Sequence, residues 1–497
     1  MLAPLVRRRR TIAIGVAFLV TVSLLLAIAH FGRRVEYELP WGFGSVIADR
    51  KGLHQKKQCA DDLDYLRRNT YGLSNLVKHQ RICVHPHVSD NVDRMDVKQI
   101  PSPTFGAPDQ RVLNLSKKCQ TEPPTDDDTP CQTLNLDVSK PYPKQDYSEI
   151  VFAVATQLNR LRDSLPVFKH WLADTNATMV SIVQGEVSDR ELKTIRKEYA
   201  KAGIKLVTTR PEDPGTPGNA QHFTMLRTIL KKTTPHEKWI GIIDDDTFFP
   251  SLYPVKEVLK KYDASQNLYL GDVSESSFNI KVHGYMAFGG GGAFITRPLA
   301  STLEPEIDNC MKEIPGREGD HLLSKCIYKK TDTNLTQVPG LHQLDMGGDV
   351  SGFYESGRLP LSLHHWKSWH RVAVGEMAEV AQFCGDCIMQ RWKLGDNAIF
   401  TNGYSLAEYP QGTKDLDLSK LEATWALSEF REHWKASFGE LRDKLDGSKK
   451  KSYTIIDSER VGDKLRQVYL RRAPTSKDEE ENEKRVDEVI EFLWDWS

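Results

Sequence analysis

Three adjacent aspartates, Asp244, Asp245 and Asp246, directly follow an apolar run at residues 239–243. Adjacent carboxylates repel one another, so a stable fold has to offset their charge. A hard divalent cation with oxygen ligands does this, and such an ion also bridges substrate phosphates. The alternative is a solvated acidic turn, which we favour for the aspartates at 126–128. Because ligands of α/β sheets bind beyond the carboxyl ends of strands, residues 244–246 predict a metal site.

A second candidate is the run of four glycines from Gly289 to Gly292. Glycine allows the backbone to approach a ligand closely. The run is neither a Walker loop nor a dinucleotide-binding GxGxxG motif. By itself it is equally typical of a flexible turn.

Asp320 and the pair His364 and His365 are further candidates. Asp320 precedes an apolar run and should lie at a helix N-terminus, where its charge suits the helix dipole. From the pattern alone, that structural role is the simpler interpretation. The two histidines lie in a short apolar run, so they should point to opposite faces of a strand. One of them could then face a metal while the other packs in the core.

Strands and helices alternate from residue 148 onward. Apolar runs predict strands at 150–155, 179–183, 204–207 and 239–243. A helix between the second and third strands should begin at Ser188, with Glu191 completing a capping box. This alternation implies βαβ units and a mostly parallel sheet.

Residues of about 148–370 resemble the Fringe-like β-1,3-glycosyltransferases of glycosyltransferase family 31, and the matching segments come in the same order as in that family. The resemblance rests on the segments 152–156 with Arg162, 239–248, 270–272, 289–292, 318–322, 345–352 and 360–366. Residues 390–392 and 401–410 further resemble a fungal and plant branch of Fringe-like proteins.

The resemblance implies a GT-A type α/β fold and an inverting mechanism. The implied reaction transfers a hexosyl residue from a UDP-sugar to a glycan or glycoprotein and forms a β-1,3 linkage. Members of the family transfer galactose, N-acetylglucosamine, N-acetylgalactosamine or glucose. A galactosyltransferase similar to core 1 synthase is our first expectation.

The resemblance also implies roles for individual residues. Asp246 and His364 would bind Mn²⁺, with His365 as the alternative to His364. Asp320 would be the general base that takes the proton of the acceptor hydroxyl. The UDP-sugar would be bound by Thr156, Arg162, Asp244, Asp245, Gly290 and Gly291.

The N-terminus predicts a membrane anchor. Four arginines at 7–10 precede residues 11–31, which carry no formal charge. This run matches the ~20 residues that span a bilayer and exceeds the ~7–15 apolar residues of a cleaved signal peptide. By the positive-inside rule residues 1–10 stay in the cytoplasm. We therefore expect a single-pass type II protein of the Golgi or ER membrane with its body in the lumen.

The expected organisation has five parts. Residues 1–10 form the cytoplasmic tail and residues 11–31 the anchor. A lumenal stem at 32–147 is rich in proline and lacks a long periodic run. The catalytic domain spans 148–370, and 371–497 form a C-terminal accessory module with helical stretches and no visible chemistry.

The eight cysteines agree with a lumenal location, where disulfides form. Their connectivity cannot be read from the sequence. A lone Cys384-Gly-Asp-Cys387 motif favours a structural disulfide over a zinc or redox site. Glycosylation sequons begin at Asn114, Asn176 and Asn334.

The net charge of −1 offers no electrostatic argument for a nucleic-acid partner, and we expect none. The sequence does not indicate an oligomeric state. Two alternatives remain open: a non-catalytic lumenal protein of the same fold that binds UDP or glycans, and a metal-dependent phosphohydrolase. The phosphohydrolase would normally need more metal ligands for a two-ion site.

Overall fold

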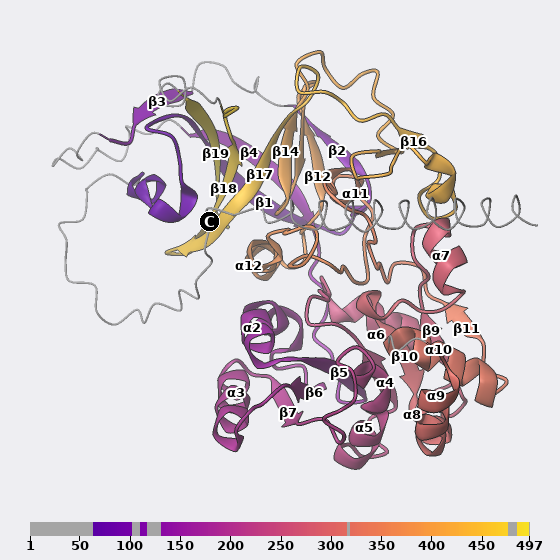
Figure 1. Cartoon of the computed structure of the whole chain (residues 1–497). Coiled ribbons are helices and arrows are strands. Elements are labelled where there is room, and N and C mark those ends of the chain that lie inside the picture. The colour runs from indigo at the N-terminus through magenta and orange to yellow at the C-terminus, as the bar shows by residue number, and fades with distance from the viewer. Residues whose placement is uncertain (1–62, 102–109, 117–130, 316–318, 476–484, 497) are drawn as a thin grey trace, which may run out of the picture. The chain divides into compact units, whose positions relative to one another are not determined.

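The computed structural model describes residues 63–101, 110–116, 131–315, 319–475 and 485–496 (Figure 1). The predicted tail and membrane anchor lie outside these residues. Within the described part of the chain, no helix is both long enough and apolar enough to cross a membrane. The chain divides into Met1–Cys59 and Ala60–Ser497, and the second unit is described below.

A seven-stranded sheet carries the predicted chemistry, in the order β11-β9-β10-β8-β5-β6-β7. Its strands are β5 (Ile150–Gln157), β6 (Thr178–Gln184), β7 (Lys205–Thr209), β8 (Trp239–Ile242), β9 (Tyr269–Gly271), β10 (Ala293–Thr296) and β11 (Leu335–Gln337). Strand β10 is antiparallel to β8 and β9, whereas the other neighbours pair in parallel. The α/β class is confirmed, with one antiparallel strand interrupting the predicted parallel sheet.

Both faces of this sheet are buried, which explains the continuous apolar runs of its strands. Ile150, Phe152 and Val154 of β5 enter one core, and the intervening Val151 and Ala153 enter another. The first core includes side chains of α2 (Leu158–Leu172), α3 (Asp189–Lys201) and α6 (Leu252–Leu259). The second includes side chains of α4 (Gln221–Thr224), α5 (Leu226–Lys232), α8 (Arg297–Leu303), α9 (Ile307–Glu313) and α10 (Gly319–Lys330).

The predicted capping box is confirmed at the start of α3. The Ser188 hydroxyl accepts from the backbone N–H of Glu191, and the Glu191 carboxylate accepts from the backbone N–H of Ser188. Between β7 and β8 the chain forms two short helices, α4 and α5, which are separated at Met225.

The predicted stem and C-terminal module form a single ten-stranded sheet. Its strands are β1 (Leu76–Ser89), β2 (Val97–Ile100), β3 (Arg111–Asn114), β4 (Gln132–Ser139), β12 (Arg391–Leu394), β13 (Ala398–Thr401), β14 (Ser405–Glu408), β17 (Lys451–Val461), β18 (Lys464–Arg471) and β19 (Val486–Trp494). Strand β1 pairs in parallel with β19, and β2 pairs in parallel with β12 (Figure 1). The expected stem and the expected C-terminal module therefore contribute to one sheet, whereas the seven-stranded sheet is formed only by residues between 147 and 371. Pairing partners several hundred residues apart leave no local signal in the sequence.

The C-terminal region also contains less helix than expected. Its helices and short strands are α12 (Val374–Cys384), β15 (Leu421–Glu422), η5 (Arg431–His433), α13 (Lys435–Phe438) and β16 (Leu441–Arg442). The remaining short elements are η1 (Asp64–Arg67), η2 (Asn69–Tyr71), α7 (Ser277–His283), η3 (Gly289–Gly291), η4 (Glu304–Glu306) and α11 (Ser351–Tyr354). Helix α12 contacts both α2 and β17, so it links the two sheets.

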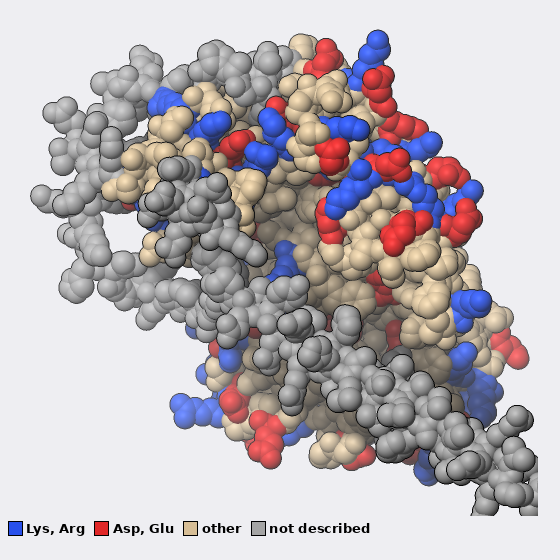
Figure 2. All heavy atoms as spheres, turned by 45° about the horizontal axis from the view of Figure 1, so that its top comes forward, with Lys and Arg blue, Asp and Glu red and all other residues tan. Residues whose placement is uncertain are grey.

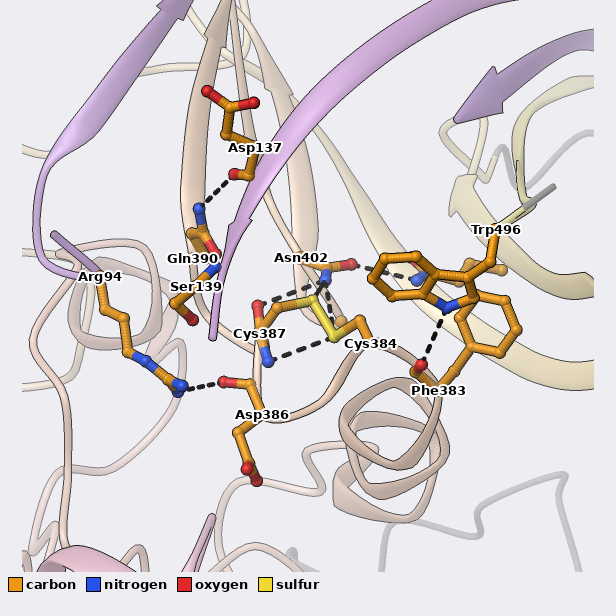
Figure 3. Close-up of a disulfide and its surroundings, with 12 residues drawn as sticks. Arg94, Asp137, Ser139, Phe383, Cys384, Asp386, Cys387, Gln390, Asn402 and Trp496 are labelled. Carbon is orange, nitrogen blue, oxygen red and sulfur yellow. Dashed lines mark hydrogen bonds between the residues drawn. A yellow bond between two sulfur atoms is a disulfide. The ribbon is translucent and has the colours of Figure 1, made fainter. Parts of the chain in front are cut away.

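Cys384 and Cys387 form a disulfide at the end of α12 (Figure 3). Both residues are buried, and the Asn402 side-chain amide donates to the Cys387 sulfur at 2.8 Å. The Arg94 guanidinium donates to the Asp386 carbonyl oxygen, which ties this turn to the segment before β2. The predicted structural disulfide is confirmed.

The other described disulfides join Cys83 to Cys131 and Cys310 to Cys326. The first connects β1 to the residue before β4. Cys59 and Cys119 lie outside the described residues.

Charged side chains of both signs are interspersed on the face shown in Figure 2. This mixture agrees with the net charge of −1 over the whole chain.

Candidate functional site

The three aspartates lie just beyond the carboxyl end of β8, as predicted. Asp245 and Asp246 are 4% and 3% exposed, while Asp244 is partly exposed. A pocket of about 270 Å³ opens beside them. It is lined by Ala155, Thr156, Gln157, Arg160, Gln184, Gly218, Asn219, His222, Asp244, Asp245 and Asp246.

Asp245 is held by two cationic side chains and a hydroxyl. Its two carboxylate oxygens accept from the Arg160 guanidinium at 2.5 and 2.6 Å. It also accepts from the Thr156 hydroxyl, and the Lys367 ammonium lies 3.4 Å away. Thr156 lines the pocket, and its hydroxyl donates to Asp245.

Asp246 and Asp244 both face His364. The His364 Nε2 lies 3.1 Å from Asp246 Oδ1 and 3.2 Å from Asp244 Oδ2. Burial alone would lower the pKa of His364, but its hydrogen bonds with these two carboxylates raise it to about 10. Burial alone would likewise raise the pKa of Asp246, but hydrogen bonds from His364 and Ser368 hold it below its usual value.

His365 does not point away from His364, so the expectation of opposite strand faces is wrong. Both residues lie just after an isolated bridge at Leu363 rather than in a strand. His365 has a left-handed φ of 58°, which turns the chain. Its ring stacks on Trp369 at 4.0 Å between centroids, and its Nε2 lies 3.5 Å from Asp345 Oδ1.

Asp246, His364 and His365 could hold a metal ion, because one ligand atom from each lies within 4.8 Å of the others. Carboxylate and imidazole ligands suit a first-row divalent ion such as Mn²⁺. The His364 Nδ1 lies 3.2 Å from the Gln343 carbonyl oxygen, to which it can donate. That hydrogen bond would orient the ring and leave the Nε2 lone pair for a metal, a common arrangement at metal sites.

The glycine run packs against this group. A Cβ at Gly290 would meet the His364 ring at 2.0 Å, and a Cβ at Gly291 would meet the Leu341 carbonyl oxygen at 2.7 Å. The close approach that we expected toward a UDP-sugar is therefore made toward the protein itself. Gly290 and Gly291 are both buried.

Asp320 lies in the first turn of α10, as predicted. Its Oδ2 accepts from the Gly289 backbone N–H at 3.2 Å. Gly289 precedes the glycine that packs on His364, so the predicted base and the predicted metal ligand lie on either side of one short backbone segment.

Arg162 lies away from this cluster. Its guanidinium pairs with Glu198 of α3 at 3.1 Å, whereas Arg160, two residues earlier, lines the pocket and bonds to Asp245. Residues two apart on a helix point in different directions, so only one of the two arginines can face the pocket.

His222 was not singled out from the sequence. Its Nε2 lies 3.1 Å from Asp244 Oδ1, and a Cβ at Gly319 would meet the His222 Cβ at 2.6 Å. His222 thus connects Asp244 to the helix that carries Asp320. No sequence motif marks it, because the preceding residues 210–219 form an irregular connection.

Comparisons with known proteins point to sugar transfer. A family model described as a protein of unknown function, DUF604, matches residues 279–380. A mouse β-1,3-glucosyltransferase is 25% identical over 227 residues, which are 45% of this chain and 41% of that protein. Its human counterpart is 26% identical over 145 residues, 29% of this chain and 28% of that protein. The chain thus spans less than half the length of the curated relatives that it matches.

Solved structures give weaker matches. The glycosyltransferase GlyE of Streptococcus pneumoniae is 12% identical with a TM-score of 0.32, covering 46% of this chain and 58% of that one. A mannosyltransferase from Pyrobaculum calidifontis, solved with GDP-Man and Mn²⁺, is 13% identical with a TM-score of 0.29, covering 44% and 64%. Such low TM-scores do not establish a shared fold. The sequence matches alone therefore relate part of this chain to β-1,3-glycosyltransferases.

Proposed function

We propose that this chain is an inverting β-1,3-glycosyltransferase of the GT-A type that transfers a hexosyl residue from a UDP-sugar to a glycan or glycoprotein. The matches to β-1,3-glucosyltransferases make glucose the first candidate for the transferred sugar, ahead of the galactose that we expected from the sequence. The arginines at 7–10 and the uncharged residues 11–31 support a type II anchor in the Golgi or ER membrane.

One observation carries the proposal. The Gly289 N–H bonds to Asp320, and the next glycine packs on His364, which in turn contacts Asp246. A carboxylate base and a candidate metal group therefore flank one backbone segment next to the aspartate pocket. Such a pair is what a single displacement at a sugar carbon requires.

In the proposed reaction the donor lies in the pocket beside Asp244, Thr156 and Arg160. Bound Mn²⁺ would supply positive charge to offset the negative charge that grows on the leaving diphosphate. Asp320 accepts the proton of the acceptor hydroxyl as that oxygen bonds to C1 of the sugar. The bond from C1 to the UDP oxygen breaks on the opposite face, so the configuration inverts and no protein nucleophile is needed.

Calorimetric titration of the chain with UDP, with and without Mn²⁺, tests the site. Metal-dependent UDP binding is expected, and its absence would contradict the proposal. A panel of UDP-sugars, read by UDP release with glycan acceptors present, then identifies the transferred sugar. UDP binding without turnover would favour the non-catalytic alternative, and release of inorganic phosphate from phosphate esters would favour a phosphohydrolase.

A further inference from the structure

Helix α7 borders the candidate site with one of its faces. Asn279 donates to Asp345 Oδ2 at 3.0 Å, and Asp345 in turn lies beside His365. One helical turn later, the His283 ring lies 6.1 Å from the ring of Phe288, the residue before Gly289. Residues four apart share a helix face, so this face of α7 runs between the candidate metal group and the segment that holds Asp320.

The adjacent face of α7 is apolar and exposed. Phe278 and Val282, again four residues apart, are 54% and 58% exposed. The Phe278 ring stacks on His433 of η5 at 5.7 Å between centroids, and Phe430 stacks on the same histidine at 5.9 Å. Phe430 is 53% exposed. Helix α7 and the C-terminal segment that leads to β16 meet here (Figure 1).

We call Phe278, Val282, Phe430 and His433 the aromatic wall. Its side chains come from two regions about 150 residues apart in the chain. Apolar groups left in water at the rim of a site mark a binding surface more often than scattered exposed residues do. Trp369, 55% exposed and stacked on His365, adds another exposed ring beside the candidate metal group.

We propose that the aromatic wall binds the glycan acceptor, so that the C-terminal region contributes to acceptor recognition. This inference rests on the proposed glycosyltransfer. The donor pocket is lined by β5, α2 and the aspartates, and no residue of α7 lines it. Helix α7 instead contacts Asp345 and Phe288. Phe288 precedes Gly289, whose N–H bonds to Asp320, so an acceptor on α7 would lie near the proposed base.

The chemistry of the wall selects a sugar as its occupant. The C–H face of a pyranose ring is apolar and packs on aromatic rings, while its hydroxyls bond to polar groups at the edge of the stack. Ligand sites combine apolar walls with a few such polar groups. Here Asn279 and the two histidines, His283 and His433, supply them beside Phe278 and Phe430.

Two single variants of the full chain test the wall, Phe278→Ala and Phe430→Ala. The control is Met95→Ala, which removes a side chain of the same 54% exposure outside the wall. Each protein is checked for unchanged thermal stability, then for Mn²⁺-dependent UDP binding. Transfer is measured with p-nitrophenyl glycosides and an array of natural glycans as acceptors, and with a glycoprotein.

Each wall variant should raise the acceptor KM by about tenfold, the usual scale for losing an important aromatic contact. Their UDP dissociation constants should stay within about twofold of wild type. The control Met95→Ala should keep both its UDP dissociation constant and its acceptor KM within about twofold of wild type. Unchanged acceptor KM values in both wall variants would overturn the inference, as would loss of transfer to the glycoprotein but not to free glycans. The second result would assign the wall to the polypeptide instead. If wild-type protein fails to bind UDP with Mn²⁺, the proposed glycosyltransfer itself falls, and this inference with it.

Discussion

Two buried charge clusters of this protein look alike but differ in their partners. At the end of β8, Asp246 meets His364. In the ten-stranded sheet, Glu491 of β19 meets His79 and Arg81 at 3.0 Å and Arg466 at 3.4 Å. A histidine can release its proton and take up a metal instead, whereas an arginine keeps its charge. Asp246 could therefore exchange its histidine partner for a metal ion, whereas Glu491 keeps two arginines beside it in any case.

The pKa values express the same difference. Burial alone would raise the pKa of Glu491, but a hydrogen bond with His79 and the charges of the arginines lower it to about 2. Glu491 thus stays ionised beside two arginines that keep their charge. Asp245, bonded by Arg160, resembles this structural cluster more than it resembles its neighbour Asp246. Burial of a carboxylate alone therefore does not indicate a metal site. A partner that a metal ion can replace, such as His364, does.

The largest effect is expected for Asp246→Asn. Loss of an ionised metal ligand should lower turnover by roughly 10³-fold or more and abolish Mn²⁺-dependent UDP binding. Asp487→Asn in β19, another fully buried acid, is the matched control. It should lower thermal stability and leave UDP affinity unchanged in the folded protein. If Asp246→Asn still binds UDP in an Mn²⁺-dependent way, Asp246 is not the metal ligand, and its cluster does not differ from that of Glu491 in function.

Asp320→Asn separates catalysis from binding. The amide cannot accept the acceptor's proton but still caps a helix about as well as the acid. Turnover should fall about 10²–10⁴-fold while thermal stability and UDP affinity persist. A folded variant with near-normal turnover would exclude Asp320 as the base and leave Glu318, whose position lies outside the described residues, as the next candidate.

Glu491→Gln should act on folding alone. Removing one partner of a buried ion pair leaves the arginines uncompensated, which costs about 3–5 kcal/mol of unfolding free energy. Urea unfolding measures this cost. Folded Glu491→Gln protein should bind UDP with wild-type affinity. A tenfold loss of that affinity would show that the two clusters are coupled.

Glu376 of α12 should make the unfolding free energy depend on pH. Burial raises its pKa to about 7 against hydrogen bonds from Ser458. Its folded form therefore holds a proton more tightly than the unfolded chain does, and the unfolding free energy should fall as pH rises from about 4.5 to about 7, by up to about 3 kcal/mol. Glu491, with a lowered pKa, acts with the opposite sign and loses its contribution only on strong acidification.

Urea unfolding of wild type and Glu376→Gln at pH 5 and pH 8 checks this. The variant should lack the part of the pH dependence that Glu376 causes. An identical change of unfolding free energy between pH 5 and pH 8 in both proteins would mean that the Glu376 pKa is not raised.

The smallest effect is expected for His365→Ala. His364 contacts both Asp244 and Asp246, whereas His365 faces Asp345 and Trp369. We expect His365→Ala to weaken Mn²⁺-dependent UDP binding by about tenfold, the low end of the range for residues that support a metal ligand. His364→Ala should weaken it more, and the reverse order would make His365 the principal ligand.

Local pattern alone determined much of the seven-stranded sheet. Strands β5, β6, β7 and β8 could be placed because strands buried on both faces read as continuous apolar runs. The α3 capping box and the position of the aspartates after β8 follow from neighbouring residues in the same way. Asp320 at the start of α10 was likewise predictable from the run that follows it.

Only the tertiary structure decided which side chains meet. Arg160 rather than Arg162 reaches Asp245, because the orientation of α2 against the sheet selects one helix face. His222 meets Asp244, and Gly290 admits the His364 ring, through packing between segments far apart in the chain. The pairing of β1 with β19 joins the two ends of the described chain for the same reason. Hydrogen bonds and packing contacts between distant residues depend on the folded path of the backbone, which no window of sequence contains.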